Sequence, residues 1–211
     1  MFNITFISTM HDKNGKCNAD ELYNILKKER PEVVFLEALE STYSIYDKTM
    51  FSSFGVYHRT LEIEAIQKYS EDSSFEYVPS LDRGLSDLFN NKYERICENS
   101  QFQKMVDEFN SLAKTNGFQF LNSQLCITIH QKMRMLETQL LNHNELNDAV
   151  NADIDDYENS MIRNIYSYCR INQFEKAVFM CGSAHRQSII EKIGSFNSKE
   201  KMDVNWVVYG E

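Results

Sequence analysis

The sequence predicts an α/β fold, in which helices flank a mostly parallel central sheet and a helical hairpin cap is inserted between strands three and four. Short apolar segments such as Ala177–Cys181 (AVFMC) are typical of strands buried on both faces. Up to Val78, such segments alternate with helical periodicity in the order strand, helix, strand, helix, strand, which favours parallel pairing through right-handed crossovers. Helical periodicity alone then continues to Ile171, and this stretch predicts the cap.

The N-terminal elements follow from local signals. Phe2–Thr9 alternates and is rich in β-branched residues, which predicts the first strand. Asn18, with a glutamate three residues later, forms a capping-box pattern that opens a helix, and Pro31 ends this helix. Val33–Leu36 is the second strand, and it leads directly into Glu37, a carboxylate that packing does not require there.

The remaining elements complete the sheet and the cap. A helix is expected over Tyr57–Tyr69, and a third strand over Phe75–Val78, closed by Pro79. Four further helices are expected over 85–97, 102–114, 118–143 and 153–171. The third of these carries an apolar stripe at helical spacing, formed by Phe118, Leu121, Leu125, Ile129, Met133, Leu136 and Leu140. After the strand at Ala177–Cys181 come a glycine turn, a helix and a last strand, Val204–Tyr209.

Length and composition limit the classes of function. We expect one domain over residues 1–211, with residues 85–150 as the cap insertion. The net charge of −9, without a compensating basic stripe, argues against nucleic-acid binding. No apolar run approaches the ~20 residues that span a bilayer, so no membrane association is expected, and we interpret the N-terminus as a strand rather than a signal peptide. Five cysteines without C-x-x-C spacing favour reduced thiols and a cytoplasmic location.

Polar residues gather where the predicted strands end. Strand one ends near His11, strand two at Glu37, strand three at Asp82-Arg83, and strand four leads through Gly182 and Ser183 into His185. Ligands of parallel α/β sheets bind outside the carboxyl ends of the strands. Two imidazoles and a carboxylate there would suit zinc, iron, cobalt or manganese. The alternative is that Gly182 makes an ordinary tight turn and His185 is an ordinary polar residue at the start of a helix.

Four short motifs resemble one protein group. S-T-M-H at 8–11, P-E-V-V-F-L-E at 31–37, D-R at 82–83 and G-S-A-H at 182–185 look like the TraB/PrgY/GumN group. That group is related to the Tiki metalloproteases and, more loosely, to ChaN-like haem-binding lipoproteins and erythromycin esterases. Its signature is two G-x-x-H motifs near the ends of the domain and a glutamate after the second strand. The resemblance covers residues 4–40, 77–84 and 158–193, and the middle helices carry none of it.

The resemblance implies roles for individual residues. His11 and His185 match the two motif histidines and Glu37 the motif glutamate, a set associated with metal-dependent hydrolysis in the Tiki branch. Arg163 resembles an arginine of a helix motif, and Asp82-Arg83 the pair after strand three. Ser8 stands where the group has glycine, so a close backbone approach there is lost or altered. Arg163 also falls opposite the apolar stripe of its own helix, so that it faces either solvent or a pocket under the cap.

Two functions follow as hypotheses. The first is a metal-dependent hydrolase of peptide or ester bonds, in which a manganese, cobalt or zinc ion is held by His11, Glu37 and His185. Glu37 would also activate water, and Arg83 and Arg163 would stabilise negative charge. The second is a non-catalytic protein that binds a peptide or small ligand, as a signal inhibitor like PrgY or a haem- or iron-binding protein like ChaN. A third, that the site has decayed, is compatible with the change at Ser8.

Other residues receive smaller roles. His58 could border the pocket together with Asp82, Gly182 and Ser183, whereas His130 and His143 are interpreted as surface or cap residues. The acidic run 153–158 is interpreted as the first turn of a helix. Ser183 lacks the G-x-S-x-G pattern of serine hydrolases. Any homo-oligomer is expected to form through the cap.

Overall fold

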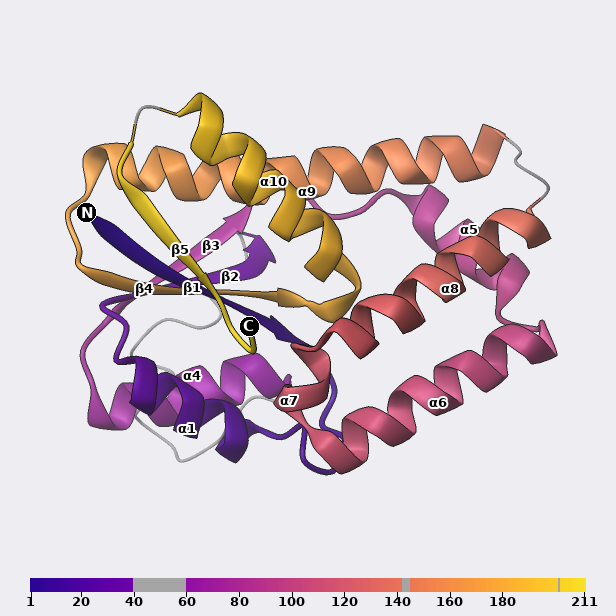
Figure 1. Ribbon diagram of the computed structural model, residues 1–211, viewed down its shortest axis with the longest axis horizontal. Helices are drawn as coiled ribbons and strands as arrows, with labels where there is room; N and C mark the ends of the chain where they lie inside the picture. Colours follow the sequence, from indigo (N-terminus) through magenta and orange to yellow (C-terminus); the bar gives the residue numbers. More distant parts are fainter. Residues whose placement is uncertain (40–59, 142–144, 201) are drawn as a thin grey trace.

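A five-stranded sheet with entirely parallel strands forms the centre of the protein (Figure 1). This computed structural model describes residues 1–39, 60–141, 145–200 and 202–211. The strand order is β3-β2-β4-β1-β5. The strands that lead into the two histidine motifs, β1 and β4, are therefore neighbours in the interior of the sheet. The predicted α/β class and parallel sheet are confirmed. The strands are β1 (Phe2–Thr9), β2 (Val33–Leu39), β3 (Glu76–Leu81), β4 (Lys176–Gly182) and β5 (Val204–Val208).

Helices cover both faces of the sheet. α1 (Ala19–Glu29) and α4 (Leu61–Asp72) lie on one face, and α9 (Glu145–Ile171) and α10 (Arg186–Lys199) lie on the other (Figure 1). Alternate residues of a strand point to opposite faces. Accordingly, Val178 and Met180 pack with α1 and α4, whereas Phe179 and Cys181 pack with α9 and α10. The nearly continuous apolar run of β4 is therefore a consequence of burial on both sides.

The start of α1 is built as the sequence predicts. The Asn18 side chain accepts a hydrogen bond from the Glu21 N–H at 3.0 Å, which satisfies one of the free donors of the first turn. At the other end, Arg30 adopts a left-handed conformation (φ 54°) and terminates the helix just before Pro31.

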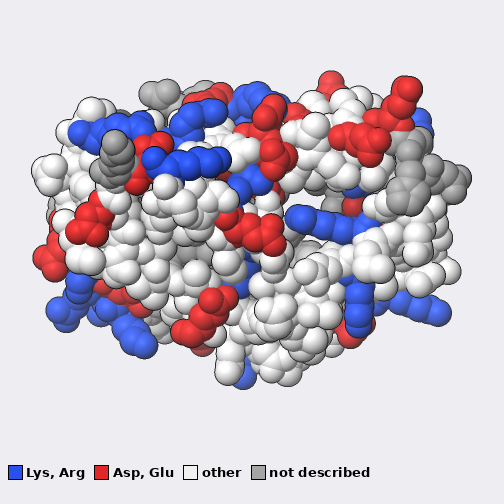
Figure 2. Space-filling model, turned by 45° about the horizontal axis from the view of Figure 1, so that its top comes forward, with Lys and Arg blue, Asp and Glu red and all other residues white. Residues whose placement is uncertain are grey.

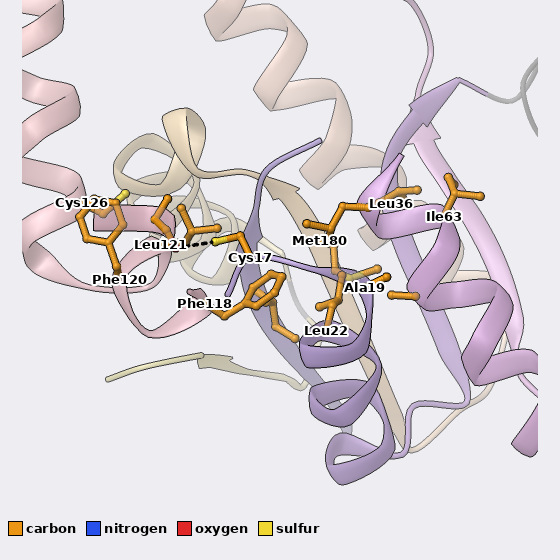
Figure 3. Close-up of a cluster of buried hydrophobic side chains, with 14 of the residues drawn as sticks. Cys17, Ala19, Leu22, Leu36, Ile63, Phe118, Phe120, Leu121, Cys126 and Met180 are labelled. Atoms are coloured by element: carbon orange, nitrogen blue, oxygen red, sulfur yellow. Dashed lines mark hydrogen bonds between the residues drawn. The ribbon is translucent and has the colours of Figure 1, made fainter. Parts of the chain in front are cut away.

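The cap lies beyond the carboxyl ends of the strands. It contains α5 (Asp87–Ile96), α6 (Ser100–Asn116), α7 (Phe118–Leu121) and α8 (Gln124–Leu140), with α6 and α8 packed as a hairpin and α5 packed on α9 (Figure 1). The core of the α1 face continues into this cap, because Phe118, Phe120 and Leu121 belong to the same apolar cluster as Leu22 and Met180 (Figure 3). α9 runs through residue 150 without a break and so belongs to both the cap and the sheet layer.

Three predicted boundaries are wrong. The third strand continues through Pro79 to Leu81, and Pro79 is tolerated because β3 is an edge strand, where an N–H facing outward is not needed. The expected helix over 118–143 is two helices, because Ser123 is extended and caps α8, and Leu125 is consequently 51% exposed instead of buried. The acidic run 153–158 lies in the middle of α9, not in its first turn.

Two predictions fall outside the described residues. These are His58, with the beginning of the helix expected over Tyr57–Tyr69, and His143. In the described part of the chain, no helix combines the length and the apolar character needed to cross a membrane.

Candidate functional site

The ends of β1, β2 and β3 border a cleft of about 290 Å³, which we call the strand-end cleft. Parallel strands present their carboxyl ends at one edge of the sheet, and here they bring His11 and Glu37 to the same cleft. Glu62 from α4 and Tyr157 from α9 complete its polar wall. The lining consists of His11, Leu36, Glu37, Ala38, Leu39, Thr60, Glu62, Ile63, Leu81, Gly84 and Tyr157.

Glu37 is held from two sides near the end of β2. Its Oε1 accepts a hydrogen bond from the Tyr157 hydroxyl at 2.7 Å, and its Oε2 accepts one from the Gly182 N–H at 2.6 Å. Its side chain is only 7% exposed. The φ of Gly182 is −56°, a value that any residue can adopt, and a Cβ at that position would stand 3.4 Å from Oε2, an ordinary contact. The chain turns just after Gly182, and the Gly182 N–H donates to Glu37.

His185 lies directly after β4, at the end of the 3-10 turn η2 (Ser183–His185). Its Nδ1 is 2.7 Å from Oε1 of Glu158, and its Nε2 is 3.6 Å from Oε1 of Glu37. An ionised carboxylate only accepts hydrogen bonds, so Nδ1 carries a proton, and Nε2 faces Glu37. The ring is 12% exposed and stacks obliquely on Tyr157, with 5.6 Å between the ring centres. His185 is thus a mostly buried ring whose orientation is fixed between two carboxylates.

Glu158 supports this orientation from the middle of α9. Its carboxylate also accepts a hydrogen bond from the Ser188 hydroxyl and forms an ion pair with the Lys192 ammonium group at 3.3 Å. Burial by itself would raise the pKa of Glu158, but the hydrogen bond with His185 and the charge of Lys192 outweigh it and lower the pKa. Glu158 is therefore ionised at neutral pH, although its side chain is 2% exposed.

His11 forms a second histidine–carboxylate pair on the opposite wall. Its Nδ1 lies 3.1 Å from Oε1 of Glu62, which also accepts a hydrogen bond from the Thr9 hydroxyl at 2.8 Å. The hydrogen bond to Glu62 raises the pKa of His11, whose side chain is 62% exposed, to about 9, and the charges of Glu62 and Glu37 act in the same direction. At neutral pH the ring is protonated, so that a metal ion would have to displace this proton.

The three predicted ligands are only partly assembled. Glu37 and His185 are in near contact, and the charge of Glu37 acts on His11 across the cleft. However, over residues 1–39, 60–141, 145–200 and 202–211, no three His, Cys, Asp or Glu side chains are grouped so that they could hold a metal ion. The arrangement is two imidazoles, each bound through Nδ1 to a buried carboxylate, with Glu37 between them.

The residues after β3 take part in ion pairs with α9. Arg83 pairs with Asp153 at 2.6 Å, and Arg163 lies 3.5 Å from Asp82, which also accepts a hydrogen bond from Asn164 at 2.8 Å. The side chain of Arg163 is 60% exposed, so of the two orientations considered it adopts the solvent-facing one. Neither arginine lines the strand-end cleft, and their placement attaches the β3 loop to α9.

A second and larger cavity of about 530 Å³ lies under the cap, and we call it the cap cavity. His185 and Glu158 line this cavity, and His185 also lies 3.6 Å from Glu37, which lines the strand-end cleft. His130, from α8, is in the wall of the cap cavity: Nε2 is 3.2 Å from the Ser183 hydroxyl, and the ring packs on Phe109. The lining consists of Phe89, Lys92, Tyr93, Val106, Phe109, Asn110, His130, Met133, Arg134, Glu137, Thr138, Asn151, Ile154, Asp155, Glu158, Ala184, His185 and Ser188.

His130 should make stability depend on pH. Burial, with smaller effects from Arg134 and His185, lowers the pKa of His130 from 6.5 to about 4. Between these values the unfolded state binds more protons, so stability falls as the pH falls, and we expect a loss of about 2 kcal/mol between pH 7 and pH 5. Urea unfolding at both pH values should show this loss in the wild type and a smaller loss in His130→Gln. Equal losses in the two proteins would contradict the assignment.

Sequence reasoning missed the two supporting carboxylates and Tyr157. Glu158 lies three residues before Met161 and four before Ile162, both fully buried, so its helical phase placed it on the buried face. Glu62 stands between Leu61 and Ile63, and all three are buried. For both Glu62 and Glu158, the signal in the sequence was an acidic residue at a helical position whose neighbours on the same face are apolar.

Ser8, which stands where the G-x-x-H motif has glycine, forms hydrogen bonds through both its side chain and its backbone. The Ser8 hydroxyl accepts a hydrogen bond from Nη1 of Arg186 at 3.2 Å, and the Ser8 N–H donates to Oδ1 of Asn122 at 2.8 Å. Ser8 is fully buried. The serine is thus integrated into the packing at the end of β1.

Comparison with known proteins identifies no family. No protein-family model matches the sequence, and no curated protein matches it. Among solved structures, a protein from Bacillus cereus matches with a TM-score of 0.39 and 10% sequence identity. The match covers 98% of this chain and 64% of the Bacillus protein.

Proposed function

We propose that the protein is a metal-dependent hydrolase of peptide or ester bonds, with its reaction centre at Glu37 and His185. The observation that carries this proposal is the pair of histidine–carboxylate contacts, His185–Glu158 and His11–Glu62. Histidines that bind metals usually donate their other ring N–H to a carboxylate, which fixes the ring and leaves the second nitrogen for the metal. Kinship with the TraB/PrgY/GumN group is part of the proposal and is supported by the four motifs.

The donor types fit a divalent metal. The 3.6 Å between Nε2 of His185 and Oε1 of Glu37 is close to the separation of two ligands that each lie about 2.1 Å from one ion. In addition, Oε2 of Glu62 is buried in the wall of the cleft without a hydrogen-bond partner in the described part of the chain. Buried polar atoms are almost always satisfied, so this atom indicates a missing polar partner in the cleft. We propose that His11, Glu37 and His185 hold manganese, cobalt or zinc.

The chain's own residues would then act as follows. Glu37, oriented by Tyr157 and Gly182, takes the proton of the attacking water. Glu37 can then pass this proton to the leaving group, while His185, held by Glu158 through Nδ1, presents Nε2 toward the same carboxylate as a metal ligand would. When bound, the metal ion would polarise the carbonyl group and lower the pKa of water.

A non-catalytic binding protein is the second candidate. The observation in its favour is that both oxygens of Glu37 already accept hydrogen bonds and that the three proposed ligands are not grouped around one point within the described residues. In this reading, the strand-end cleft and the cap cavity capture a peptide or small ligand without cleaving it.

Metal titration tests the proposal. Calorimetric titration of the metal-free protein with Mn²⁺, Co²⁺ and Zn²⁺ should show one site, and His11→Ala and His185→Ala should each weaken binding by at least about 100-fold. His130→Ala is the matched control and should bind the metal normally. The loaded protein should cleave members of a panel of fluorogenic peptides and 4-nitrophenyl esters. Failure of all three metals to bind would contradict the proposal.

Two further expectations belong to this proposal. A cytoplasmic location is proposed from the pattern of the five cysteines. Any homo-oligomer is proposed to form through the cap. Both remain predictions.

A further inference from the structure

The cap cavity has the walls of a binding site for an apolar group. Side chains from α5, α6, α8 and α9 face it, and its volume of about 530 Å³ is within the range typical of ligand pockets. Figure 2 shows this face hollowed in the half of the molecule that the cap occupies, with basic side chains at the opening. The apolar wall is formed by Phe89, Tyr93, Val106, Phe109, Met133 and Ile154.

Most charges that line the cavity are neutralised within the protein. The Lys92 ammonium group lies 2.7 Å from the Glu137 carboxylate, and their side chains are 4% and 6% exposed. On the opposite wall, Lys192 forms ion pairs with both Asp155, at 2.5 Å, and Glu158, at 3.3 Å. These groups therefore leave little net charge for a ligand to meet.

Arg134 is the exception. Its Nη2 donates a hydrogen bond to the backbone carbonyl of Ala184 at 2.5 Å, so the guanidinium group stands beside the residue that precedes His185. Among the residues that the structure describes, no carboxylate forms an ion pair with Arg134. A carbonyl uses one of the five N–H donors of the guanidinium group, and the remaining donors suit the two oxygens of a carboxylate.

We propose that the cap cavity binds the end of the substrate that carries an aromatic or branched aliphatic side chain next to a free carboxylate. The side chain would lie against Tyr93, Phe109 and Met133, and the carboxylate would bind Arg134. The bond to be cleaved, on the other side of the same residue, would then reach His185, because His185 lines the cap cavity and lies 3.6 Å from Glu37 in the wall of the strand-end cleft. This names the substrate class of the proposed hydrolase, a peptide or N-acyl amino acid with an apolar C-terminal residue, and to that extent it rests on the proposed function.

Two matched probes test the proposal without requiring catalysis. N-acetyl-L-phenylalanine carries the carboxylate, and N-acetyl-L-phenylalaninamide lacks its charge. In calorimetric or NMR titrations of the metal-free protein, the acid should bind at least about tenfold more tightly than the amide. Arg134→Gln should abolish this preference, and Lys132→Gln, which removes the same charge from a residue of the same helix that does not line the cavity, should keep it. Val106→Trp, which fills the cavity, should weaken both probes.

The outcomes separate this inference from the proposed function. Equal affinity of the wild type for the two probes, or an unchanged preference in Arg134→Gln, would overturn the inference even if metal binding and hydrolysis are found. Binding of the acid with the expected dependence on Arg134 and Val106, without metal binding or hydrolysis, would support the inference about the ligand and leave the hydrolase proposal refuted.

Discussion

Arg186→Ala is expected to lower the free energy of unfolding by about 3–5 kcal/mol. Arg186 lies at the start of α10 with a side chain that is 1% exposed. Its guanidinium group donates to the Ser8 hydroxyl at 3.2 Å, to the side-chain and backbone oxygens of Asn122 at 3.0 Å each, and to the Tyr209 carbonyl at 2.9 Å. One side chain thus joins the end of β1, the α7–α8 junction and the C-terminal segment.

The size of this effect follows from burial. Removing Arg186 leaves several buried oxygens without their donor, and each such loss costs about 1 kcal/mol or more. The melting temperature of a chain of this length should fall by about 10 °C. Arg170→Ala is the control, because Arg170 is 48% exposed and pairs with Glu200 at the surface, and it should change stability by less than about 1 kcal/mol. Similar melting temperatures for the two variants would contradict the structural role of Arg186.

Glu37→Gln is expected to reduce the rate of hydrolysis by about 10³-fold, with little change in stability. The amide has the same shape, but it is too weak a base to take a proton from water. Its carbonyl oxygen can still accept a hydrogen bond from Gly182 or from Tyr157, so the fold around it should persist. The measurements are the steady-state rate with the best substrate of the peptide and ester panel and a thermal unfolding curve.

The same variant separates the two candidate functions. Glu175→Gln is its control, since Glu175 is exposed just before β4, and this variant should retain full activity. Loss of cleavage by the metal-loaded Glu37→Gln variant, with unchanged affinity for the substrate, would show that Glu37 acts in the chemistry. Unchanged cleavage would exclude Glu37 as the base, and a wild type that only binds would favour the non-catalytic protein.

Local sequence patterns were sufficient to predict the strands and helices that form the layers of the fold. Strand β1 has the predicted bounds, α1 begins at the predicted cap, and the parallel strand ends bring His11 and Glu37 to one cleft. Such features depend on periodicity and capping, which neighbouring residues in the sequence determine.

The features that the sequence did not predict depend on contacts between residues far apart in the chain. The break between α7 and α8 occurs where the Asn122 side chain bonds to the backbone of Ser8, a partner 114 residues away. Likewise, Pro79 is tolerated within β3 because of its edge position, which the strand order sets. The bond of Glu158 to His185 joins two helical segments whose relative position no local pattern contains.

Anomalous X-ray diffraction from crystals grown with Mn²⁺, Co²⁺ or Zn²⁺ tests the central claim most directly. The claim is that two imidazoles, each hydrogen-bonded to a buried carboxylate, bind one metal ion together with Glu37. We predict a single anomalous peak about 2.0–2.3 Å from Nε2 of His185, from a ring nitrogen of His11 and from a carboxylate oxygen of Glu37. A strand-end cleft without a peak, or a peak coordinated by other residues, would contradict the claim.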